Sequence, residues 1–170
     1  MNPSIIALMD RMDPEARNAC TTCMIKYEEI LRLAPGSSHN HQAWPGGYLD
    51  HVKEAINIAL KLYPVMEEIR PLPFSLSDAL FVLFFHDIEK PWKYVLKEKF
   101  LNKTERHEFR KNIITELGYN LSEEQEQAIK YTEGELDYSP TERKMSPLAA
   151  FCHMCDVASA RIWWDQPEHD

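Results

Sequence analysis

Residues 79–87 have the sequence ALFVLFFHD, and this stretch is the most informative about the fold of the chain. Seven apolar residues run without interruption and end at His86-Asp87. A segment that is apolar on every side is buried all round, and an ionised carboxylate there costs free energy unless something compensates it. A metal ion compensates this pair well, because an imidazole and a carboxylate can donate electron pairs to one cation. The structural alternative is a salt-bridged Asp87 beside a core histidine, and the pair alone does not separate the two.

Two further segments carry potential metal ligands. His51 lies at the start of a strongly helical segment and follows Gly46-Gly47 closely. Two of the chain's five glycines are therefore adjacent just before this helix. Paired glycines are typical of a place where the backbone passes close to another group. Asp156 lies inside a second apolar helical segment, residues 147–158. Two imidazoles and two carboxylates form a mixed nitrogen and oxygen set that suits a borderline or hard divalent cation.

Taken in order, His51, His86-Asp87 and Asp156 resemble the H…HD…D signature of the HD-domain superfamily of metal-dependent phosphohydrolases. The Gly-Gly-x-x-x-His entry and the small residues after Asp156 resemble it as well, and the resemblance covers about residues 39–162. It implies an all-α fold and one divalent ion (Mn, Co, Ni, Fe, Zn or Mg) on these four ligands. Glu89 departs from the pattern, because many members have glycine at that position.

The helical patterns predict an all-α protein of the HD-domain type. We expect a single compact helical domain over residues 1–170, with about six to eight helices. The expected helices span 14–33, 48–62, a segment from 75–78 to the His-Asp pair, 104–117, 123–133, and a last one from 147. Pro64 should interrupt the chain after the second helix, and Pro91 should end or kink the His-Asp helix.

Length and charge narrow the class of protein. A chain of 170 residues can bury a sizeable core without help from metals or disulfides. No run of about 20 apolar residues and no basic-then-apolar start occur, which predicts a cytoplasmic protein without a membrane partner. The net charge of -8 argues against stable binding to nucleic acid. A homo-oligomer is compatible with the sequence.

The four cysteines form two pairs with CxxC spacing, Cys20/Cys23 and Cys152/Cys155. This spacing is typical of a structural zinc site. Both pairs fall inside predicted helices, however, and cysteine is an ordinary small buried residue in a reducing compartment. We therefore expect four core cysteines, and a second, structural zinc is the alternative.

A basic segment follows the His-Asp pair. Residues 90–111 contain eight bases and three acids, so this segment carries +5 while the other 148 residues carry -13. Lysine and arginine beside a metal site could neutralise phosphate oxygens. Most of these bases are expected on a solvated helix face, and Lys90 and Lys93 are the best candidates for substrate binding. Lys90 is also the candidate for stabilising charge in the transition state.

Five other residues are candidates with a plain structural alternative. Glu89 could be a general base or a partner for Lys90. His41 could contact substrate or be an exposed loop residue, and Trp44 could stack on a base or simply pack. His107 could serve a second metal ion, and Glu133 could act as an acid or base.

The resemblance implies hydrolysis of phosphate esters or anhydrides, with Asp87 as ligand and proton acceptor. A compact acidic domain favours a small nucleotide, and a deoxynucleoside triphosphate triphosphohydrolase or a 5′-nucleotidase leads. A 3′-5′ exonuclease or a cyclic-nucleotide phosphodiesterase is the alternative. A non-catalytic nucleotide-binding module is a further alternative, although such a module would be expected to lack one of the four ligands.

Overall fold

A computed structural model describes residues 5–135, 141–163 and 165–166, and this part of the chain is helical without a strand. Its elements are α1 Ile5–Leu8, the 3-10 helix η1 Met9–Arg11, α2 Pro14–Lys26, α3 Glu28–Leu33, α4 Gly47–Ile69, α5 Leu76–Phe85, α6 Lys90–Tyr94, α7 Lys103–Glu116, α8 Glu123–Tyr131 and α9 Pro147–Ile162. The prediction of an all-α protein is confirmed. None of these helices is both long and apolar enough to cross a membrane.

Side-chain caps fix where the main helices begin. Ser75 and Ser122 each form a capping box: the serine side chain accepts from the backbone N–H three residues on, and the side chain of that residue accepts from the serine backbone N–H. Ser146 caps α9 in the simpler way, and Asn102 caps α7. The starts of four helices are therefore encoded locally, and all four were expected at about these residues.

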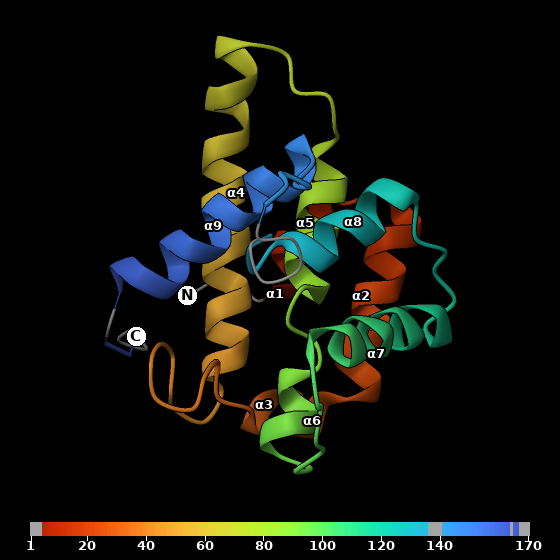
Figure 1. Cartoon of the computed structure of the whole chain (residues 1–170), viewed down its shortest axis with the longest axis vertical. Helices are drawn as coiled ribbons and strands as arrows, with labels where there is room; N and C mark the ends of the chain where they lie inside the picture. The colour runs from red at the N-terminus through yellow and green to blue at the C-terminus, as the bar shows by residue number, and fades with distance from the viewer. Residues whose placement is uncertain (1–4, 136–140, 164, 167–170) are drawn as a thin grey trace.

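The centre of the molecule is a crossing of three helices, α4, α5 and α9 (Figure 1). Helix α9 runs across α4, and α8 packs against both α5 and α9. All but two side chains of α5 are buried, among them Phe81 and Phe85, which are in ring contact at 4.8 Å. The uninterrupted apolar run therefore forms the central helix. The helix ends at Phe85, so His86 and Asp87 lie where the three helices cross.

Three expectations about helix ends were wrong in detail. Helix α4 continues through Pro64 to Ile69, because the packing of Tyr63 and other apolar neighbours against the core offsets the lost hydrogen bond. The first long helix breaks at Tyr27, which leaves two helices, α2 and α3. Pro91 does not end the His-Asp helix but lies in the first turn of α6, where no N–H donor is needed.

All four cysteines are buried and free within the core. Burial raises the pKa of the Cys23 and Cys155 thiols to about 12, which keeps them protonated. Among the described residues, no cysteine belongs to a group that could hold a metal ion. The core interpretation agrees with this arrangement, and the four-cysteine zinc site does not.

Candidate metal centre

Four side chains from three parts of the chain meet where α4, α5 and α9 cross. His51 comes from α4, His86 and Asp87 from the turn after α5, and Asp156 from α9. Their facing nitrogen and oxygen atoms lie 3.1 to 3.7 Å apart in the five pairs that are in contact. Donors bound to one ion at about 2.1 Å are separated by roughly 3.0 Å in an octahedron and 3.4 Å in a tetrahedron. The spacing is that of donors around a single cation.

Hydrogen bonds orient both imidazole rings toward this point. The Nδ1 atom of His86 lies 2.8 Å from the carbonyl oxygen of Leu83, which can only accept, so Nδ1 carries the proton. The Nδ1 atom of His51 lies 3.0 Å from the Ser159 hydroxyl, which itself donates to Glu54 at 2.9 Å. In each neutral ring the Nε2 lone pair is therefore free to bind a metal, as in other histidine sites with a fixed tautomer.

The electrostatics of the centre also favour a cation. The two Nε2 atoms are 3.4 Å apart, so their lone pairs repel unless a positive charge lies between them. Burial lowers the pKa of His86, but the carboxylates of Asp87 and Asp156 outweigh burial and raise it to about 9. The same surroundings that raise this pKa would stabilise a divalent ion, and the donor set therefore fits one.

The paired glycines allow the loop before α4 to lie close against its first turn. A Cβ atom on Gly47 would lie 1.9 Å from the carbonyl oxygen of Gln42, and Gly46 has a φ of 85°. Gln42 is buried and donates to Glu54 at 2.8 Å and to the Ser159 carbonyl at 3.2 Å. The close approach expected from the sequence is thus the packing of this loop against the groups that orient His51.

A cavity of about 340 Å³ opens onto the centre. It is lined by Asn40, His41, Asp87, Lys90, Glu133, Asp156, Val157, Ala160 and Arg161. The Lys90 ammonium forms an ion pair with Asp87 Oδ2, so a fixed positive charge lies beside the ligands. Two of the predicted substrate contacts, His41 and Lys90, therefore line the same cavity as the metal centre, as does the predicted acid/base Glu133.

Two predicted substrate contacts are not brought to this cavity. Trp44 is half-buried and its Nε1 donates to Asp50 at 2.8 Å, which holds the indole against the start of α4. Lys93 is exposed, and its ammonium lies 5.0 Å from the ring centroid of Tyr94. Apart from the imidazole of His41, the described lining offers no aromatic ring on which a base could stack.

Sequence reasoning missed Arg110, which is 1% exposed. Its guanidinium binds Glu89 through two hydrogen bonds of 2.7 Å and Glu133 through a third of 2.7 Å. Glu89 is therefore buried with both oxygens engaged by Arg110. Arg110 precedes the buried Ile113 and Ile114 by three and four residues. This helical spacing was the one signal in the sequence that Arg110 lies on the core face of α7.

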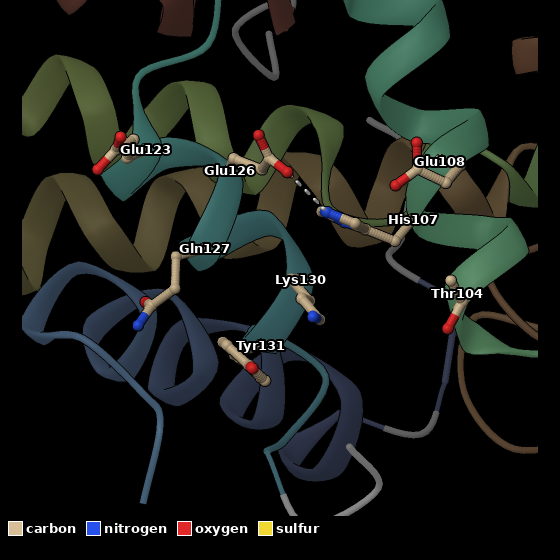
Figure 2. A pocket seen from close by; sticks show the side chains of 8 residues that line it. All are labelled: Thr104, His107, Glu108, Glu123, Glu126, Gln127, Lys130 and Tyr131. Atoms are coloured by element: carbon tan, nitrogen blue, oxygen red, sulfur yellow. Dashed lines mark ion pairs between the residues drawn. The ribbon is translucent and has the colours of Figure 1, made fainter. Parts of the chain in front are cut away.

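His107 is not brought to the four ligands. It lies in a separate pocket of about 380 Å³ between α7 and α8, where its Nε2 is 3.6 Å from Glu126 Oε1 (Figure 2). The described groups that could hold a metal do not include it. The structure therefore does not support a role for His107 in a second metal site.

Comparison with known proteins gives one relative of defined chemistry. The chain is 34% identical over 65 residues to the dihydroneopterin 2′,3′-cyclic phosphate phosphodiesterase of Methanocaldococcus jannaschii. The match covers 38% of this chain but only 26% of that protein. No protein-family model matches the chain, and no solved structure matches it.

Proposed function

We propose that this chain is a metal-dependent phosphohydrolase of the HD-domain type that cleaves a phosphate ester of a small molecule. The observation that carries the proposal is the four-donor centre of His51, His86, Asp87 and Asp156, whose two carboxylates line a cavity that Lys90 also lines. A divalent ion bound there would lower the pKa of a water molecule toward neutrality and polarise the phosphate. The similarity to a phosphodiesterase over part of the chain supports the same class of reaction.

The residues around the centre have distinct roles in this proposal. Lys90 neutralises a phosphate oxygen, since its ammonium lines the cavity next to Asp87. Burial raises the pKa of Asp87, but Lys90 and His86 outweigh it and lower the pKa overall, which makes Asp87 a weak base and a good ligand. Glu133 lines the cavity with one oxygen held by Arg110, and we assign to it the transfer of the proton.

Between the finer alternatives, the comparison favours a diester. The relative is named for a cyclic phosphate diester, whereas nothing in the cavity singles out a triphosphate. A cavity of about 340 Å³ is near the lower end of the range for small-molecule sites, which favours one nucleotide-sized substrate over a polymer. A small cyclic phosphodiester is therefore our first candidate, ahead of a deoxynucleoside triphosphate or a 5′-nucleotide.

A substrate panel tests this assignment. The protein is loaded in turn with Mn, Co, Ni, Fe, Zn and Mg and offered 2′,3′-cyclic nucleotides, 3′,5′-cyclic nucleotides, deoxynucleoside triphosphates, 5′-nucleotides and single-stranded RNA. Monoester, phosphate, pyrophosphate and triphosphate are measured separately. Metal-dependent opening of a cyclic diester is the expected result. Degradation of RNA with inertness toward every mononucleotide would favour an exonuclease, and metal-bound protein that binds nucleotides without cleaving any would favour a binding module.

A further inference from the structure

One nitrogen of Arg110 stands at the meeting point of three carboxylates. Its Nη2 lies 2.7 Å from Glu89 Oε1, 2.7 Å from Glu133 Oε2 and 3.8 Å from Asp87 Oδ1. The side chain reaches this point from α7 and is closed off from solvent. A guanidinium this deeply buried is stable only where carboxylates surround it, and here three of them do.

The same three carboxylates could hold a metal ion by themselves. One oxygen each of Asp87, Glu89 and Glu133 lies within 4.8 Å of the others. Asp87 points Oδ2 toward the two imidazoles of the metal centre, and its Oδ1 has no hydrogen-bond partner among the described residues. A carboxylate with one oxygen directed at each of two positions is the usual bridge between two neighbouring cations. The Nη2 atom of Arg110 occupies the second of these positions.

The charged groups of the two carboxylate clusters, together with the Lys90 and Arg110 that pair with them, balance with one divalent ion and not with two. Asp87, Glu89, Glu133 and Asp156 contribute four negative charges, and Lys90 and Arg110 contribute two positive ones. Two negative charges remain, which a single divalent ion neutralises. A second divalent ion would leave an excess of two positive charges in a buried site, at a large cost in desolvation.

We propose that Arg110 is a built-in cation that takes the place of a second metal ion, so that the chain binds one divalent ion. This inference rests on the proposed metal centre and adds to it the determinant of the metal count. Arg110 is a positioning residue: it fixes Glu133 at the cavity and keeps Asp87 Oδ1 from recruiting another ion.

Metal stoichiometry of the wild-type chain gives the first test. Protein equilibrated with saturating Mn²⁺ and then separated from free metal should retain one ion per chain by elemental analysis. Its electron paramagnetic resonance spectrum should be that of an isolated Mn²⁺. Two ions per chain with the spectrum of a spin-coupled pair would overturn the proposal.

Charge variants give the second test. Arg110→Met leaves a net charge of -3 around the centre, and we expect it to bind a second Mn²⁺ and to show a spin-coupled pair. Its thermal stability should keep rising at Mn²⁺ concentrations above those that saturate the wild type. Arg106→Met, one turn earlier on α7, is the matched control and should retain one ion. A single ion in Arg110→Met at saturating Mn²⁺ would contradict the proposal.

The double variant Arg110→Met/Glu89→Gln keeps the test decisive if Arg110→Met does not fold. It removes one charge of each sign, which restores the wild-type balance of -2, and we expect one ion per chain. Two ions in this variant would sink the argument from charge. None of these measurements depends on hydrolysis, so the metal count can fail while the proposed activity stands, and the activity can fail while the count stands.

Discussion

Two buried groups of carboxylates share Asp87 and differ in what neutralises them. In the candidate metal centre, Asp87 and Asp156 face two imidazoles, which bind a metal only as neutral donors and so leave the balancing charge to be supplied by the ion. On the other side of Asp87, Arg110 supplies that charge from within the chain and binds Glu89 in the fork geometry that guanidinium favours. A cluster of acids therefore does not by itself identify a candidate metal site, because on one side of Asp87 an arginine already supplies the positive charge.

Removing the charge of the shared residue should break both groups at once and produce the largest effect. Asp87→Asn keeps the side-chain volume but withdraws a ligand, so bound metal should fall from one per chain to below detection after dialysis. A bound metal supplies several kcal/mol of transition-state stabilisation, and turnover should therefore fall by roughly a thousandfold or more. The measurements are elemental analysis and initial rates on the best substrate of the panel.

Circular dichroism should show that Asp87→Asn still folds, since the core of α4, α5 and α9 remains. Asp10→Asn is the control, because Asp10 is exposed and pairs only weakly with Arg17 at 3.4 Å. Retention of stoichiometric metal by Asp87→Asn would remove Asp87 from the ligand set.

Substitution of Lys90 should have the next largest effect. Comparison with Lys93 separates a charge in the cavity from a charge on the surface. Lys90 contacts Asp87 at the cavity, whereas Lys93 is exposed. A charge-assisted contact to phosphate is worth about 1.5–3 kcal/mol, so Lys90→Ala should lower kcat/KM by roughly ten- to a hundredfold. Lys93→Ala should change it by less than about twofold, as is usual for a solvent-exposed charge. Equal losses in the two variants would show that phosphate is bound outside the cavity.

Loss of the hydrogen bond that orients His51 should have a smaller effect, and this effect should be on the affinity for the metal ion. Ser159→Ala removes the partner of His51 Nδ1, and the loss of such an outer partner typically weakens metal binding by about ten- to a hundredfold. Titration with Mn²⁺ by calorimetry measures this change. Ser38→Ala, in the exposed part of the loop before α4, is the control. An unchanged Mn²⁺ affinity in Ser159→Ala would mean that packing alone orients the ring.

The sequence singled out the four candidate metal ligands more clearly than the residues around them. His51, His86, Asp87 and Asp156 stood out because polar side chains in apolar helices need a special reason, and the structure brings all four together. The net charge of the segment 90–111 does not predict which of its bases faces the core, because it contains no information on where each side chain points. Only the spacing of Arg110 from Ile113 and Ile114 held that information.

Long-range contacts were beyond the sequence as well. The sequence around Trp44 does not predict that its indole donates to Asp50. The sequence around Glu89 does not predict that its partner is Arg110, 21 residues away. The capped helix starts, by contrast, depend on neighbours three residues apart, and these were predicted closely.

The smallest expected effect concerns His107, which shares the buried face of α7 with Arg110 but lies outside the metal centre. Burial lowers its pKa, Glu126 opposes this, and the positive charge of Arg110 adds to the lowering, so the net shift is downward. The folded state therefore binds the proton less readily than the unfolded state, whose histidine titrates near pH 6.5. The contribution of His107 to stability is complete above that pH and is lost as the pH falls below it.

His107→Gln should consequently lose less unfolding free energy than the wild type when the pH is lowered from about 7 to about 5, while the two respond alike above pH 7. Urea denaturation at a series of pH values measures the difference, and other titrating groups cancel when the two proteins are compared. His39→Gln is the matched control, because His39 is exposed in the loop before α4. A steeper acid loss in His107→Gln than in the wild type would mean that the protonated ring is stabilised by Glu126 and not penalised by burial beside Arg110.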